Sequence, residues 1–213
     1  MSKHNTYSPL EERINVYSHV LGIILGVVAL VLLLRRDLQN PVPLVIFSNC
    51  VFSFSMIFLY WASVTYHNTS DVKKRFRLKV LDHCAIYVLI AGTYTPYALI
   101  TMVNHGGWSL FSLAWGFAIT GIILKLLFTG RFKVLSTLLY VVMGWLIVLF
   151  GNSLMQTLPE EGIRLLILGG CFYTTGAVIY LIKKIPLNHG IFHIFVLAGS
   201  ICHFLSIYWY VGQ

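Results

Sequence analysis

Long runs of apolar residues alternate with short charged segments along this chain. Seven stretches carry no charged residue: Tyr17–Leu34, Val42–Tyr66, Cys84–Val103, Trp108–Leu124, Val134–Leu158, Leu165–Ile182 and Gly190–Val211. A hydrocarbon core ~30 Å thick needs roughly 20 apolar residues for each helix that crosses it. Soluble helices are not apolar on every face in this way. The pattern therefore predicts an all-α bundle of seven transmembrane helices.

Length and composition agree with that prediction. Of the 213 residues, 58% are hydrophobic and only 10% are charged, which excludes a soluble globular protein. Seven crossings use about two thirds of this length. We therefore expect residues 1–213 to form a single seven-span domain in the cell membrane, with no separate soluble domain.

The positions of Lys and Arg predict how the chain is oriented. With a cytoplasmic N-terminus, eleven of these residues lie on the cytoplasmic side: Lys3, Arg13, Lys73, Lys74, Arg75, Arg77, Lys79, Arg131, Lys133, Lys183 and Lys184. Only Arg35, Arg36 and Arg164 lie outside, while Lys125 is near the inner end of the fourth span. Because cytoplasmic loops are enriched in Lys and Arg, we predict a cytoplasmic N-terminus and an extracytoplasmic C-terminus.

The net charge of +8 does not indicate a nucleic-acid partner. The basic residues stand in short blocks between the spans, where anionic lipid head groups are the nearer partners. Four cysteines, Cys50, Cys84, Cys171 and Cys202, are scattered singly through apolar runs without the spacing of a metal or redox pair. We expect them to be small buried apolar side chains.

The third span contains the segment Gly92-Thr93-Tyr94-Thr95-Pro96. A proline inside a helix removes one backbone hydrogen bond, so we expect a kink there. A kink that serves packing alone is an equal alternative, because Gly and Pro are frequent in membrane helices.

Histidines are the residues that indicate chemistry. Of the eight, His4 lies in the tail and His105 in an outer loop. In the predicted topology, five others collect at the cytoplasmic ends of their helices: His19, His67, His83, His189 and His193. His203 lies deeper, where the more common role of a membrane histidine is that of a hydrogen-bonded packing residue.

His189 and His193 are four residues apart, so a helix places both rings on one face, a spacing that suits two ligands of one metal. His67 could supply a third nitrogen. Three protein ligands with water in the fourth position are typical of a catalytic zinc site, whereas structural sites are usually closed by four. The alternative is therefore a structural zinc that clamps the second and seventh spans, with His83 or Asp82 as the fourth ligand.

Asp82 opens the predicted third span at the same depth as these histidines. A carboxylate at the edge of the hydrocarbon needs a partner or a function. It could cap the helix, or it could bind the water of a zinc site and accept its proton during hydrolysis. Ser63 lies one turn before His67 and could orient it or contact the site, or its hydroxyl could bond only to its own helix.

These residues resemble the motifs of the haemolysin III proteins, the bacterial branch of the progestin and adipoQ receptor family. The motifs are Glu12-Arg13-Ile14-Asn15 with His19, Ser63-Val64-Thr65-Tyr66-His67 continuing to Leu81-Asp82-His83 and Gly92-Thr93-Tyr94-Thr95-Pro96, and His189-Gly190-Ile191-Phe192-His193 with His203. The resemblance covers nearly the whole chain. It implies a zinc ion on His67, His189 and His193, with Asp82 contacting the metal-bound water.

Two classes of function remain open at this stage. One is a zinc-dependent hydrolase of lipid amides or esters, or a regulator of membrane lipids, in which Asp82 and Ser63 serve the reaction. The family also resembles the alkaline ceramidases, which favours this class. The other is the cytolytic, membrane-permeabilising activity that the family name implies. The lipid substrate and the oligomeric state are left undetermined by the sequence.

Overall fold

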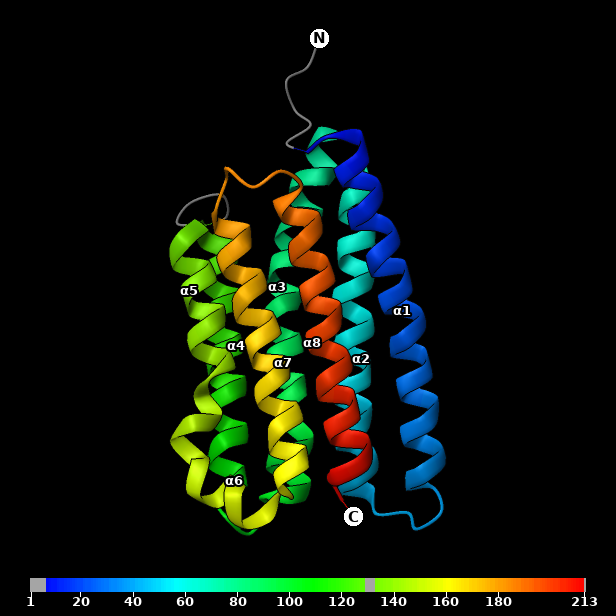
Figure 1. The fold of residues 1–213 in the computed structure, drawn as a ribbon, viewed down its shortest axis with the longest axis vertical. Helices are drawn as coiled ribbons and strands as arrows, with labels where there is room; N and C mark the ends of the chain where they lie inside the picture. The colour runs from blue at the N-terminus through cyan, green and yellow to red at the C-terminus, as the bar shows by residue number, and fades with distance from the viewer. Residues whose placement is uncertain (1–6, 129–132, 213) are drawn as a thin grey trace.

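The computed structural model describes residues 7–128 and 133–212, and these residues form helices joined by short turns (Figure 1). Lys3, His4, Arg131 and Gln213 lie outside the described residues. The elements in chain order are α1 (Pro9–Asp37), α2 (Pro43–His67), α3 (Val72–Pro96), η1 (Tyr97–Thr101), α4 (Gly107–Phe128), α5 (Lys133–Gly144), η2 (Leu146–Phe150), α6 (Gly151–Thr157), α7 (Glu160–Leu181) and α8 (Asn188–Tyr210).

Seven helical segments of the described residues are long and apolar enough to span a membrane, as predicted. The segments Val72–Thr101 and Val134–Thr157 each cross as one unit, and the other five spans are single helices. α1 begins at the end of the bundle where α2 finishes with His67, called here the His67 end, and α8 finishes at the opposite end (Figure 1). The chain is thus a multi-pass membrane protein, while the side of the membrane that each end faces stays a prediction.

Two helices begin earlier than the charge-free runs indicate. α1 starts at Pro9 rather than near Tyr17, and the Ser8 hydroxyl caps it by accepting from the Glu11 amide at 3.1 Å. α3 starts at Val72, where Asp71 accepts from the Lys74 amide at 2.7 Å. The interpretation of Asp82 as the cap of this helix is therefore wrong, because Asp82 lies well inside α3.

α3 is the central helix of the bundle. In its apolar window 72% of the residues are buried, against 28% for α1, because α3 packs against α2, α4 and α5. At Pro96, where the sequence predicts a kink, the structure shows a change in helix type. The α-helix ends at Pro96, and the π-helical turn Tyr97–Thr101 continues the span.

The fifth span is broken, which its continuous apolar sequence does not indicate. α5 ends at Gly144 and a 3-10 turn follows. The Tyr94 hydroxyl lies 2.6 Å from the Gly144 carbonyl oxygen and also accepts from the Ile147 amide at 3.3 Å. A side chain from α3 thus satisfies backbone groups that the break exposes within the membrane.

The cysteine prediction is only partly correct. Cys84 and Cys202 are buried and Cys50 is half-buried, but Cys171 is exposed on the outer face of α7. Because that face of an apolar span contacts lipid rather than the protein core, a small thiol is tolerated there without burial. All four are free thiols.

Candidate metal centre

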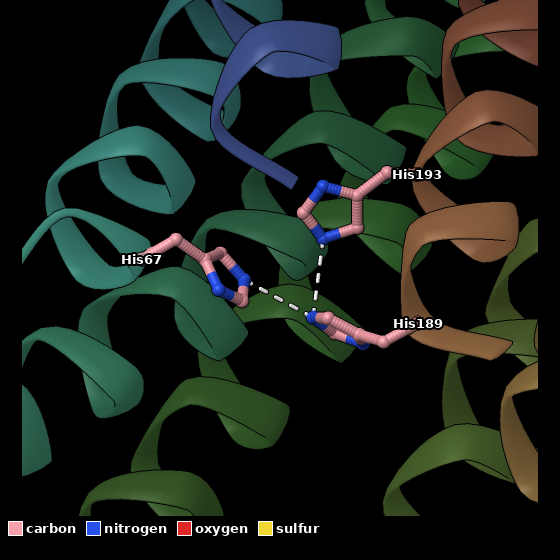
Figure 2. A group of neighbouring side chains, drawn as sticks. All are labelled: His67, His189 and His193. Atoms are coloured by element: carbon pink, nitrogen blue, oxygen red, sulfur yellow. Dashed lines mark hydrogen bonds between the residues drawn. The ribbon is translucent and has the colours of Figure 1, made fainter. Parts of the chain in front are cut away.

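Three buried histidines from two helices meet near the His67 end of the bundle. His67 comes from the last turn of α2, and His189 and His193 come from the first turns of α8. Figure 2 shows the three rings turned toward one another across the gap between these helices. The sequence separates His67 from the other two by most of the chain, and the fold brings them together as predicted.

Their distances fit a single bound metal ion. Nε2 of His189 lies 3.1 Å from Nε2 of His67 and 3.2 Å from Nε2 of His193. A tetrahedral ion with metal–nitrogen bonds of ~2.0–2.1 Å separates its ligand nitrogens by about 3.3–3.4 Å. The three side chains therefore could hold a metal with little movement.

The second nitrogens of two rings fix the tautomers that a metal requires. Nδ1 of His67 lies 2.6 Å from Oε2 of Glu12, and Nδ1 of His193 lies 3.3 Å from the Asn15 carbonyl oxygen. Both oxygens only accept, so each Nδ1 carries the proton that it donates. In the neutral form of either ring Nε2 is then unprotonated, and its lone pair faces Nε2 of His189. Lone pairs that face one another repel when the site holds only histidines, whereas a bound cation would be stabilised by them.

Two adjacent acidic residues of α1 hold this arrangement in place. Glu12 accepts from His67 and also pairs with Arg75 of α3. Oε1 of Glu11 accepts from the backbone amide of His189 at 3.1 Å, at the start of α8. The first turn of α1 thus ties together the ends of α2, α3 and α8 that carry the site.

Gly190 allows α1 to come this close to α8. A Cβ atom at position 190 would lie 2.9 Å from Cγ2 of Ile14, which is shorter than normal contacts. The glycine between the two histidines therefore lets Asn15 reach the ring of His193. The close approach of α1 and α8 is thus a physical reason for glycine at the second position of the motif His189-Gly190-Ile191-Phe192-His193.

Tyr7, which precedes the first residue of α1, covers the site. Its ring stacks on the His189 ring with centroids 4.6 Å apart and an interplanar angle of 11°. Burial raises the pKa of the Tyr7 phenol well above its usual range, so this side chain stays protonated and neutral.

Asp82 is buried beside the three histidines but outside their ligand group. Its carboxylate lies within electrostatic range of the His67 ring. The Ser63 hydroxyl is also buried and interacts with Asp82, although no described residue offers it a hydrogen bond of normal geometry. In the part of the chain that the structure describes, neither Asp82 nor His83 joins the three histidines within 4.8 Å.

The remaining predicted histidines take three different positions. The His19 ring stacks on His193 with centroids 3.7 Å apart, so it supports a candidate ligand. Nδ1 of His83 lies 2.6 Å from the Lys79 carbonyl oxygen of its own helix. Nε2 of His203 lies 3.1 Å from the Leu166 carbonyl oxygen, which agrees with a packing role deep in the bundle.

A cavity of about 260 Å³ opens next to the site, bounded mainly by α3, α5, α7 and α8. Asp82, His189 and His193 line one end of it, and Tyr97 and Leu166 line it further along. Since Asp82 and Tyr97 are fifteen residues apart along one span, the cavity extends for about 22 Å. Its other walls are mostly aliphatic and aromatic, as in sites for apolar ligands.

Five residues that orient the site are not among the site residues predicted from the sequence: Tyr7, Glu11, Glu12, Asn15 and Arg75. Glu12 and Asn15 belong only to a family motif there. The adjacent carboxylates Glu11 and Glu12 next to an apolar span could have indicated such a role, because a charged residue at a membrane helix needs a partner.

Comparison with known proteins places the chain in a family. It matches the family described as Haemolysin-III related over residues 7–204. Hemolysin-3 of Bacillus cereus is 41% identical over 201 residues, covering 94% of this chain and 92% of that protein. The Hemolysin-3 homolog of Bacillus subtilis (strain 168) is 40% identical over 200 residues, covering 94% of each chain.

A more distant relative comes from an animal. The monocyte to macrophage differentiation factor of Homo sapiens is 26% identical over 215 residues, covering 94% of this chain and 84% of that protein. The resemblance seen in the sequence motifs is thus confirmed. This chain belongs to the haemolysin III family of multi-pass membrane proteins.

Proposed function

We propose that this protein is a zinc-dependent hydrolase of membrane lipids that cleaves an acyl amide or ester bond. The observation that carries the proposal is a cluster of three buried histidine nitrogens, of which His189 and His193 line the end of an apolar cavity together with a buried carboxylate. Imidazole nitrogens suit zinc, and three protein ligands leave a fourth position for chemistry.

His67, His189 and His193 would hold the metal. A zinc ion bound there would act as a Lewis acid and lower the pKa of water in the site. Glu12 and the Asn15 carbonyl keep Nε2 of His67 and His193 unprotonated, so these nitrogens are ready to bind a cation. Their hydrogen bonds also fix the direction of each ring.

Asp82 would act as the general base. In the proposed reaction its carboxylate takes a proton from water as the water oxygen bonds to the acyl carbon. It then returns the proton to the amine or alcohol as the carbon–nitrogen or carbon–oxygen bond breaks, so no other reactant is needed. The buried Ser63 hydroxyl interacts with this carboxylate and would orient it.

The cavity would hold the acyl chain of the substrate, which would enter sideways from the bilayer. Its volume of about 260 Å³ is slightly below the usual range for ligand pockets, roughly 300–1,000 Å³. Such a narrow space fits one chain better than two. The scissile bond would then lie at the end lined by Asp82, His189 and His193.

Membrane permeabilisation is a second candidate, because two relatives are named as haemolysins. A structural zinc that clamps α2 to α8 is a third, which would need no turnover. Both alternatives leave Asp82 without a chemical task.

The test is direct incubation of purified, zinc-loaded protein with a library of N-acyl and O-acyl lipids in neutral nanodiscs. We expect release of a free fatty acid from one lipid class, and loss of this release after chelation. The matched control is the His193→Ala protein. Release from no lipid class, together with lysis of vesicles by the same preparation, would favour the permeabilising function.

A further inference from the structure

Two lysines and one carboxylate line the end of the cavity where His189 and His193 lie. Lys79 comes from α3 and Lys125 from α4, and both line the cavity together with Asp82. Each lysine interacts electrostatically with Asp82, and the two lysines interact with each other. Two lysines and one carboxylate at this end of the cavity give it an excess of positive charge.

Lys125 is the unusual member of this cluster. Lysines near the ends of membrane helices normally extend to the interface and keep their charge in water. Lys125 is only 7% exposed, and its Nζ instead donates to the Ser136 hydroxyl of α5 at 3.1 Å, beside the cavity. An ammonium group held at the polar end of an apolar channel is well placed to attract an anion.

The anion that fits must be part of a lipid. The cavity continues from the lysines along aliphatic and aromatic side chains for about 22 Å, as measured along α3. A small soluble anion would leave these walls without a partner. A lipid with one acyl chain would fill the apolar part and bring its head group to the lysines.

Resting on the proposed function, we propose that this site selects lipids with one acyl chain and an anionic head group, either carboxylate or phosphate. Lys125 is the specificity-determining residue, with Lys79 adding to the positive potential. The head group would lie beside Asp82, His189 and His193, so the same lysine that selects the lipid would also place its polar end at the metal centre.

Binding of tritiated probes to the purified protein in phosphatidylcholine nanodiscs tests this inference without any need for turnover. The probes are laurate, dodecyl phosphate and the neutral dodecanol, which share one chain length. We expect the wild-type protein to bind at least one anionic probe roughly tenfold more tightly than dodecanol. A preference for laurate alone or for dodecyl phosphate alone would identify the head group.

Variants separate charge from structure. Lys125→Gln should lose most of the preference, Lys125→Arg should keep it, and Lys74→Gln, on the exposed start of α3, is the control. Ser136→Ala removes the bond between α4 and α5 and keeps the charge, so it should also retain the preference. An unchanged preference in Lys125→Gln, or an equal loss in Ser136→Ala, would overturn the assignment.

The metal provides the last control, since a bound cation would also attract anions. The binding assay is repeated with the His193→Ala protein, which we expect to lack metal. Persistence of the anionic preference there supports the lysines, and its disappearance would show that the metal selects the head group. If the preference persists but no lipid is hydrolysed, the proposed hydrolase fails and the binding site stands.

Discussion

The carboxylate of Glu12 lies 2.6 Å from Nδ1 of His67, although 55 residues separate them in the chain. This contact fixes the tautomer of a candidate metal ligand and directs its Nε2 toward His189. It joins the first turn of α1 to the last turn of α2.

Glu12→Gln should weaken metal binding by about 10–100-fold, the usual scale for loss of a carboxylate that supports a histidine ligand. The measurement is the dissociation constant for zinc in competition with a chromophoric chelator. Arg75→Gln, which keeps the contact between Glu12 and His67, should have a smaller effect. Glu161→Gln, exposed at the start of α7, is the control. Equal affinities in all of these proteins would show that Glu12 does not support the site.

Loss of a ligand should have a larger effect than loss of its support. We expect about one zinc per chain in the purified protein and loss of most of it in His189→Ala or His193→Ala, because two remaining ligands make a poor site. His203→Ala should keep its metal, since its Nε2 bonds the Leu166 carbonyl. Elemental analysis of monodisperse fractions measures this. The same zinc content in all three variants would exclude the paired histidines as ligands.

Orientation in the membrane follows from the asymmetry of Lys and Arg. A reporter inserted in the turn between α2 and α3, residues 68–71, should be cytoplasmic, and one fused after Gln213 should be extracytoplasmic. Paired alkaline phosphatase and green fluorescent protein fusions measure the two sides. Because five spans of the described chain separate the two fusion points, both reporters on one side would contradict the structure.

At the opposite end of the bundle, Asp37 should contribute strongly to stability. It is buried, pairs with Arg36 at 3.0 Å and accepts from Nδ2 of Asn49 at 2.7 Å. Asp37→Ala should destabilise the protein by about 3 kcal/mol, because it leaves a partly buried guanidinium without its carboxylate.

The matched comparison is Glu160→Ala, which breaks an exposed pair with Arg164 at 2.6 Å. Exposed pairs on a helix contribute roughly 0.3–0.5 kcal/mol, so this change should be nearly neutral. Unfolding in detergent measures both variants. Similar losses in the two would mean that the Asp37 pair is no stronger than a surface pair.

The sequence allowed prediction of the spans and of the three clustered histidines for definite physical reasons. Long apolar runs directly indicate the segments that cross the membrane. The resulting topology places the end of the second span and the start of the seventh at the same depth, and these ends carry the three histidines. His189 and His193 share a helix, so their proximity is local geometry.

What could not be predicted depends on contacts between distant segments. Helix α1 can begin at Pro9 because residues of α2, α3 and α8 pair with the carboxylates of Glu11 and Glu12. A prediction that ends each helix at the first charged residue therefore places the start of α1 too late. The break after Gly144 likewise depends on Tyr94 of another helix. Asp82 was expected to open α3, whereas Asp71 caps it.

The most direct test of the proposed hydrolase is the activity of Asp82→Asn with its metal content measured on the same sample. The substitution preserves the size of the side chain and removes only the base. We predict that zinc stays bound while lipid hydrolysis falls by roughly 10²-fold or more, the usual scale for loss of a general base. Unchanged hydrolysis with zinc retained would contradict the mechanism, and loss of zinc would instead make Asp82 a ligand of a structural site.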